Sequence, residues 1–164
     1  MPALKEWVVR VFYKEGFVDP LGEMARRDMR DLGVFDVREV TVMPTYIIKG
    51  SISRGSVEKA CRELLADPVT QSYTINTPPK LEGGWVVEVG LKPGVTDFVG
   101  ESVKKGLVVI GISGVESVKT GATYLIKGAM REEELEFLCV KSIVNPLIHD
   151  FNIRGGITDA RSGD

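Results

Sequence analysis

The sequence contains the stretch KEGFVDPLGE at residues 14–23 and a related stretch, KPGVTDFVGE, at residues 92–101. In the first stretch, Asp19 supplies a side-chain oxygen that can cap a helix, and Pro20 suits the first helical position because no backbone donor is needed there. Asp97 stands at the position of Asp19 in the second stretch. Each stretch therefore predicts a loop that leads into a helix, and their recurrence predicts a repeated structural unit.

The two stretches belong to a longer internal similarity with a constant offset of 78 residues and no gap. The similarity starts at Trp7 and Trp85 and ends at Ile75 and Ile153. About 21 of roughly 69 aligned positions are identical, and many others exchange one residue for a similar one. A register kept over this length is hard to obtain by chance, so we interpret the chain as two tandem copies of one unit.

Each copy shows the same order of local patterns. In the first copy, β-rich runs bounded by turn residues lie at residues 7–12, 37–42, 45–49 and 72–75. Pro44 breaks the middle of this series, which predicts two separate strands there. Apolar residues at helical spacing lie in residues 21–32 and 57–65. The order β-α-β-β-α-β predicts an α+β fold in which two helices cover one face of a four-stranded antiparallel sheet.

The repeat also predicts how the chain is divided. We expect the two copies at residues 1–76 and 85–153, a linker at residues 77–84 and a flexible tail at residues 154–164. A four-stranded sheet with helices on one side leaves its other face bare. Two copies on one chain can cover each other's bare faces or join edges, so we expect an intramolecular pseudo-dimer.

The composition excludes several classes of protein. The chain has 43% hydrophobic and 27% charged residues, which suits a packed core with a charged surface. Its net charge of −2 provides no broad basic field for a nucleic-acid backbone. No apolar run approaches the ~20 residues of a membrane span, and the N-terminus lacks a secretory signal. Two cysteines without metal-ligand spacing favour a reducing compartment. We therefore expect a cytoplasmic protein that binds neither membrane nor nucleic acid.

The residues that most often carry chemistry do not form a catalytic set. The single histidine, His149, corresponds to Gln71 in the first copy, so a surface histidine is a simpler interpretation than a general base or metal ligand. Cys61 and Cys139 lie on apolar helical stripes, where core packing is a simpler interpretation than nucleophilic catalysis. The glycine spacing matches neither phosphate-binding fingerprint. We expect no catalytic residue, no cofactor and no metal ligand.

Several residues that recur at equivalent positions in the two copies are candidates for a role in packing or in contact with a partner protein. Gly22 and Gly100 fall early in a predicted helix, which glycine weakens, and close packing against the sheet or a partner backbone would explain both. The pairs Lys49-Gly50 and Lys127-Gly128 each end a predicted strand, where a solvated turn is the ordinary interpretation. Contact with a partner protein is the alternative. The candidate contact residues are Tyr46, Lys49, Gly50, Tyr124, Lys127 and Gly128.

The sequence resembles the PurS family, whose members are the small subunit of phosphoribosylformylglycinamidine synthase. In the first copy the resemblance rests on VFYKEGFVDPLG at residues 11–22 and LLADPV at residues 64–69, with Tyr73. In the second copy it rests on LKPGVTD at residues 91–97 and VNPLI at residues 144–148. The second copy is also similar to the PurS-like N-terminal region of the long form of the synthase subunit PurL.

This resemblance implies a non-catalytic protein of purine biosynthesis. PurS joins the ATP-dependent synthase PurL to the glutaminase PurQ, which releases ammonia for transfer. The usual PurS chain is a single copy that dimerises, so the present chain would resemble such a dimer fused into one polypeptide, with further homo-oligomerisation as an option. Two alternatives stay open: a regulatory module that binds a small effector, and the N-terminal domain of a longer PurL-like enzyme.

Overall fold

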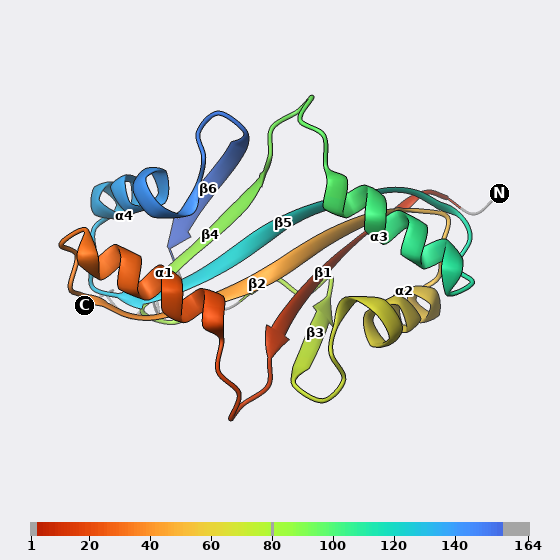
Figure 1. Ribbon diagram of the computed structural model, residues 1–164, viewed down its shortest axis with the longest axis horizontal. Coiled ribbons are helices and arrows are strands. Elements are labelled where there is room, and N and C mark those ends of the chain that lie inside the picture. The colour runs from red at the N-terminus through yellow and green to blue at the C-terminus, as the bar shows by residue number, and fades with distance from the viewer. Residues whose placement is uncertain (1–2, 80, 156–164) are drawn as a thin grey trace, which may run out of the picture. The chain divides into compact units, whose positions relative to one another are not determined.

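The computed structural model describes residues 3–79 and 81–155. The first repeat contains β1 (Lys5–Tyr13), α1 (Pro20–Asp31), β2 (Val37–Gly50), α2 (Arg54–Ala60), η1 (Cys61–Leu65) and β3 (Gln71–Ile75). The second contains β4 (Gly84–Leu91), α3 (Phe98–Val109), β5 (Val115–Gly128), α4 (Glu132–Leu138), η2 (Cys139–Ile143) and β6 (His149–Gly155), as Figure 1 shows. The segments η1 and η2 are π-helical turns that continue α2 and α4. The two repeats therefore have the same order of elements.

The strands form one six-stranded sheet in the order β3-β1-β2-β5-β4-β6. Strand β1 pairs antiparallel with β2 and with β3, and β4 pairs antiparallel with β6. Each repeat supplies three consecutive strands of this order. The predicted α+β class with two tandem copies is confirmed.

The predicted break at Pro44 is wrong, because β2 continues through it from Val37 to Gly50. The pairing of β1 with β2 ends at Arg10 and Thr45, so Pro44 lies one residue beyond the last pair. Its missing amide hydrogen therefore interrupts no pair with β1, which is how a proline is tolerated at a ladder end. Each repeat consequently contributes three strands instead of the predicted four.

The chain divides into two compact units that do not coincide with the two repeats. Unit 1 comprises Met1–Val18, Pro44–Thr77 and Gly94–Gly121. Unit 2 comprises Asp19–Met43, Pro78–Pro93 and Ala122–Asp164. Each unit therefore takes one long helix from the other repeat: α3 belongs to unit 1 and α1 belongs to unit 2. The long strands β2 and β5 each have one half in each unit.

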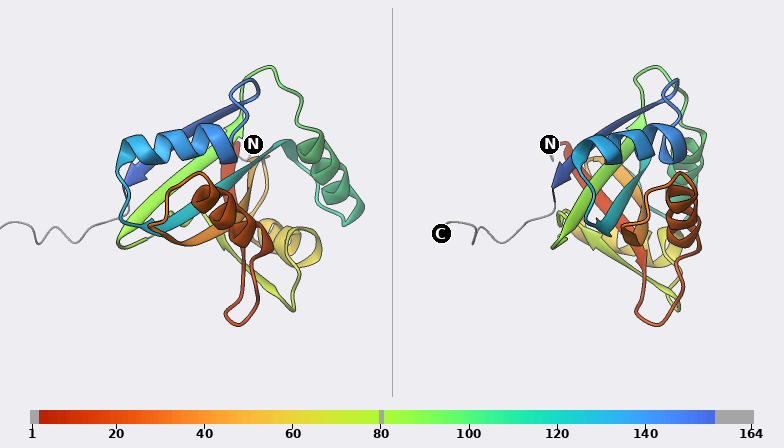
Figure 2. Two further views of the ribbon diagram at one scale, coloured as in Figure 1. Left: turned by 60° about the vertical axis from the view of Figure 1, so that its left-hand side comes forward. Right: turned by 90° about the vertical axis from the view of Figure 1, so that its left-hand side faces the viewer.

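The core of unit 1 joins side chains from both repeats. Its fully or nearly buried members from the first repeat include Val9, Ile48 and Val57, and those from the second include Leu107 and Ile112. Helix α3 packs against η1, and the two views of Figure 2 show α3 beside α2. The hydrophobic core of this unit therefore depends on both copies of the repeat.

Unit 2 is built in the same way with the roles of the repeats exchanged. Its core includes Met29 and Val37 from the first repeat with Val87, Leu135 and Leu138 from the second. Helix α1 packs against η2, and Figure 2 shows α1 beside α4. These side chains are 0–1% exposed, and their burial stabilises the unit by about 1.5–3 kcal/mol for each fully buried large aliphatic side chain.

The structure describes residues 77–79 and 81–84 of the predicted linker and residues 154–155 of the predicted tail. Leu81, in the linker, is buried. Strand β6 reaches Gly155, which pairs with Trp85, so Arg154 and Gly155 belong to the sheet. The remainder of the assigned tail, residues 156–164, lies outside the described residues.

Candidate functional site

The two helix-capping aspartates each connect a helix to a strand. Asp19 Oδ1 accepts from the Gly22 amide at 2.9 Å, and its Oδ2 accepts from the Val42 amide at 2.8 Å. Asp97 Oδ1 accepts from the Gly100 amide at 2.8 Å, and its Oδ2 accepts from the Thr120 amide at 2.6 Å. Both carboxylates are therefore used in structure. The predicted capping role is confirmed for both residues, and the contact with the strand is an addition that sequence reasoning missed.

Gly22 and Gly100 lie where these helices pack closely against strands β2 and β5. A Cβ atom at Gly22 would collide with the carbonyl oxygen of Val40, and one at Gly100 would collide with that of Val118. Only glycine can occupy such a position without moving the helix. Close packing against the sheet, rather than a partner backbone, explains why both helices contain a glycine at their third residue, although glycine weakens a helix.

His149 serves a turn, and Gln71 serves the matching turn of the other repeat. The Asn145 amide donates to His149 Nδ1 at 3.0 Å, and the Asp67 amide donates to Gln71 Oε1 at 2.8 Å. The imidazole acts here as an acceptor in place of an amide oxygen. This geometry supports the structural interpretation of the only histidine over a role in proton transfer.

The two cysteines are buried and free. Burial, with a smaller effect of the nearby Glu58 carboxylate, raises the pKa of the Cys61 thiol to about 12. Burial, with a smaller effect of Glu136, raises the pKa of the Cys139 thiol to about 12. A thiol that stays protonated is a poor nucleophile and a poor metal ligand. Both side chains therefore behave as small core residues, as the apolar stripes predicted.

The six candidate contact residues divide into two sets of three. Tyr46, Lys49 and Gly50 belong to unit 1, and Tyr124, Lys127 and Gly128 belong to unit 2. The tyrosines are half-buried against the two cores, and burial raises the pKa of both phenols.

The lysines and glycines at the strand ends differ in exposure. A Cβ atom at Gly50 would collide with the Gly114 carbonyl oxygen, and one at Gly128 would collide with that of Asp36, so both glycines serve backbone packing. The Lys49 side chain lies 3.8 Å from Glu116, and the Lys127 side chain lies 3.3 Å from Glu39. The two lysine side chains remain the accessible part of the candidate set, with roughly half of each exposed.

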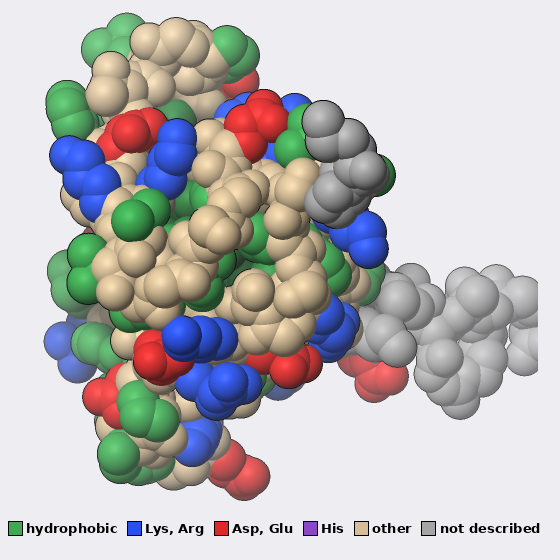
Figure 3. Space-filling model, turned by 90° about the vertical axis from the view of Figure 1, so that its right-hand side faces the viewer, with side chains coloured by type: hydrophobic (Ala, Val, Ile, Leu, Met, Phe, Trp, Pro, Cys, Tyr) green, Lys and Arg blue, Asp and Glu red, His purple; other side chains and the backbone are tan. Residues whose placement is uncertain are grey.

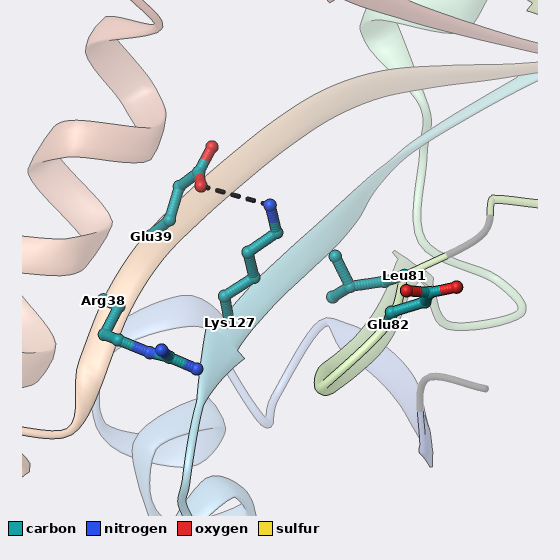
Figure 4. A pocket seen from close by; sticks show the side chains of 5 residues that line it. All are labelled: Arg38, Glu39, Leu81, Glu82 and Lys127. Carbon is teal, nitrogen blue, oxygen red and sulfur yellow. Dashed lines mark ion pairs between the residues drawn. The ribbon is translucent and has the colours of Figure 1, made fainter. Parts of the chain in front are cut away.

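Lys127 also lines an open hollow of about 580 Å³ in unit 2, with Arg38, Glu39, Leu81 and Glu82. Figure 4 shows the ion pair that joins Glu39 of β2 to Lys127 of β5. Leu81 and Glu82 come from the segment before β4. Two basic and two acidic side chains balance within the hollow, so it offers no net charge to attract an ion.

The outward surfaces of the helices carry large apolar side chains. Phe98, Val108 and Val109 of α3 are exposed, and so are Phe137 of α4 and Val140 of η2. The face shown in Figure 3 has basic, acidic and apolar side chains lying next to one another. Sequence reasoning missed these positions, because a helical stripe was interpreted only for its buried side. A comparison of the two repeats, position by position, could have found them.

Two further findings concern possible ligands and membranes. Among residues 3–79 and 81–155, no group of three or more His, Cys, Asp or Glu side chains could hold a metal ion. In the same part of the chain, no helix has the length and apolar character needed to cross a membrane.

Comparison with known proteins decides the family. The PurS family, described as phosphoribosylformylglycinamidine (FGAM) synthase, matches residues 6–78 and again residues 85–155. The chain belongs to the PurS family. The two PurS matches coincide closely with the two predicted repeats and together cover most of the chain.

Each of the two similar PurS chains matches less than half of this chain and most of its own length. The chain is 33% identical over 73 residues to the phosphoribosylformylglycinamidine synthase subunit PurS of Methanocaldococcus jannaschii. That match covers 42% of this chain and 88% of the relative. The crystal structure of PurS from the same organism, described as a subunit of formylglycinamide ribonucleotide amidotransferase, is 28% identical. It covers 45% of this chain and 96% of its own, with a TM-score of 0.33.

Proposed function

We propose that this chain is a non-catalytic subunit of the phosphoribosylformylglycinamidine synthase complex in purine biosynthesis. The observation that carries this proposal is the PurS match in both repeats. The solved PurS of Methanocaldococcus jannaschii is described as one of the subunits of such an enzyme. In this role the chain holds a PurL-like synthase and a PurQ-like glutaminase together, so that ammonia passes between them without loss to solvent.

The state of the chemistry-bearing side chains supports a structural role. Asp19 and Asp97 accept backbone hydrogen bonds, His149 accepts one in a turn, and Cys61 and Cys139 are buried. Each of these groups is accounted for by a contact within the chain. A cytoplasmic location is part of the proposal, because free thiols persist in a reducing compartment.

The accessible candidates for partner contact are Lys49 and Lys127, each at the end of a long strand. Tyr46, Gly50, Tyr124 and Gly128 support this contact indirectly, because they fix the position of the strand that carries the lysine. We include these six residues in the proposal as one contact region in each unit.

The test is reconstitution with the PurL and PurQ proteins of the same source organism, glutamine, ATP and the formylglycinamide substrate. Turnover from glutamine is expected to require this chain, whereas turnover from added ammonium chloride is expected to depend on it less. Equal glutamine-dependent turnover with and without the chain, and no complex on size-exclusion chromatography, would contradict the proposal.

The charge-balanced hollow of unit 2 suits a second function, the binding of a small effector. Its volume of about 580 Å³ lies within the range of about 300–1,000 Å³ typical of small-molecule sites. A regulatory module would show a ligand-dependent rise in melting temperature with amino acids or nucleotides, in the absence of any protein partner. The open, charge-balanced lining makes this the weaker candidate.

A further inference from the structure

The second helix of the second repeat exposes apolar side chains among acidic ones. Glu133, Glu136, Phe137 and Val140 lie three or four residues apart along α4 and η2, so they share the outward side of this helix. Leu135 and Leu138 form the opposite side and are completely buried. Phe137 is 47% exposed and Val140 is 44% exposed. We call Glu132, Glu133, Glu136, Phe137 and Val140 the α4 face.

The corresponding helix of the first repeat has a different surface. At the positions of Phe137 and Val140 it carries Lys59 and Arg62, and at the position of Glu132 it carries Arg54. Two of these cations are paired along the helix, Arg54 with Glu58 at 3.3 Å and Lys59 with Glu63 at 3.9 Å. This helix has the charged, internally paired surface expected of a helix side that faces water.

The α4 face lacks such compensation. Along α4 and η2 there are four glutamates and one lysine, a net charge of −3, whereas α2 and η1 carry three cations and two glutamates, a net charge of +1. Glu134 is paired with Arg131 at 3.0 Å, and Glu133 also acts on Arg131 by its charge; within the described residues, Glu132, Glu133 and Glu136 make no ion-pair contact. The helix N-terminus favours acidic side chains in the first turn, which includes Glu132 and Glu133, but Glu136 lies beyond that turn and four residues after Glu132, where a like charge is destabilising.

Exposed apolar side chains surrounded by charged ones are typical of protein interfaces, in which an aromatic anchor fills a hollow and a polar rim surrounds it. The negative charge of the glutamates around the apolar side chains determines which kind of partner surface can bind. Three exposed glutamates favour a surface edged by lysine or arginine and repel an acidic one.

We propose that the α4 face is the docking surface for a partner protein that offers an apolar hollow edged by basic side chains. This inference rests on the proposed function, and the partner is then one subunit of the synthase complex. The same partner is excluded from the α2 helix, because Lys59 and Arg62 would have to be buried in its apolar hollow and would meet its basic rim. Each chain therefore binds one copy of this partner through this surface, although it contains two copies of the repeat.

The test replaces the apolar side chains of the α4 face by the basic side chains found at the equivalent positions of the first repeat. The double variant Phe137→Lys with Val140→Arg is compared with the matched control Lys59→Ala with Arg62→Ala in the full chain. Affinity for each purified subunit of the synthase is measured by isothermal titration calorimetry, with circular dichroism and melting temperature as controls for folding. We expect the double variant to bind one subunit at least about 30-fold more weakly, and the control to bind it within about twofold of the parent.

The rim is tested by the triple variant Glu132→Gln, Glu133→Gln and Glu136→Gln. Its association with the same subunit is expected to be about 3–10-fold slower at low salt and to depend less on salt than that of the parent chain. If the double variant has a lowered melting temperature, Phe137→Gln replaces it, since this side chain is already half exposed and its removal opens no core cavity.

The possible outcomes separate the inference from the function on which it rests. An unchanged affinity of a folded double variant would overturn the docking surface and leave the proposed function in place. Failure of the parent chain to bind any synthase subunit would overturn both. A change in the mass of the chain alone on light scattering, without a change in subunit binding, would assign the surface to self-association and overturn the inference.

Discussion

Asp19 and Asp97 show how one side chain can fix both a helix start and its attachment to the sheet. Each carboxylate accepts one amide hydrogen from its helix and another from a strand 23 residues further along the chain. The cap was predictable, because its partner lies three residues away. The contact with the strand was not predictable from the sequence, because it depends on where the helix packs.

Replacement of Asp97 by alanine is expected to destabilise the chain by about 2–4 kcal/mol. The change removes the helix cap, worth about 0.5–2 kcal/mol, and leaves the Thr120 amide without its acceptor, at a cost of about 1–3 kcal/mol. Urea unfolding measures the difference. Asp97→Asn, which keeps one acceptor oxygen and replaces the other by an amide donor, is the comparison and is expected to lose less; equal losses for both variants would show that the retained acceptor contributes nothing to stability.

The buried thiols predict a loss of stability in alkali. The pKa of Cys61 and of Cys139 is raised to about 12 in the folded chain, above the value of about 8.5 for an exposed thiol. The folded state therefore keeps protons that the unfolded state releases. This stabilisation is complete below about pH 8.5 and declines as the pH rises towards 12, by about 1.4 kcal/mol per pH unit and thiol.

Unfolding free energies measured between pH 7 and pH 11 check this slope. The variant Cys61→Ala with Cys139→Ala is the comparison, because it lacks both titrating groups and is expected to lose less stability over the same interval. A slope that is the same in parent and variant would assign the alkaline loss to other groups, such as Tyr46 and Tyr124.

At the scale of elements, both repeats have the same turn before their last strand, β3 or β6, but a different side chain accepts the hydrogen bond that closes it. In one repeat Gln71 accepts an amide hydrogen from Asp67, and in the other His149 accepts one from Asn145. The Asx-type bonds from Val69 to Asp67 and from Leu147 to Asn145 complete both turns. The alignment of the two repeats showed that Gln71 and His149 occupy equivalent positions. Only the structure shows that both side chains accept a hydrogen bond from a backbone amide.

His149→Gln is therefore expected to leave the stability of the chain within about 0.5 kcal/mol of the parent, because glutamine performs this role at the matching position. His149→Leu removes the acceptor and is expected to cost about 1 kcal/mol. Thermal unfolding near neutral pH distinguishes the two variants. If glutamine is as damaging as leucine, the imidazole has a function beyond the turn.

At the scale of the whole molecule, the two sequence repeats and the two compact units are different divisions of the same chain. Leu107 and Ile112 of the second repeat lie in the core of unit 1, and Met29 and Val37 of the first repeat lie in the core of unit 2. Neither repeat contains a complete core. Tandem duplication has therefore not produced two independent domains.

Residues 1–83 and residues 84–164, expressed separately, are expected not to form stable monomers. Each would expose the buried surface that its missing helix covers, equivalent to several large side chains at about 1.5–3 kcal/mol each. Mixing the two chains is expected to restore a 1:1 complex with the circular dichroism of the parent, and light scattering would give its mass. Two folded, monomeric fragments would contradict the conclusion that each core needs side chains from both repeats.

The sequence by itself determined the repeat, the positions of the helix starts and the PurS resemblance, because these depend on residues close together in the chain or on a constant register. It could not determine that β2 continues through Pro44, since the tolerance of a proline depends on which neighbouring strand needs its amide. It could not assign α1 and α3 to opposite cores either. Only the tertiary structure decided that, because a helix buries its apolar side against whichever strands and helices lie beside it in space.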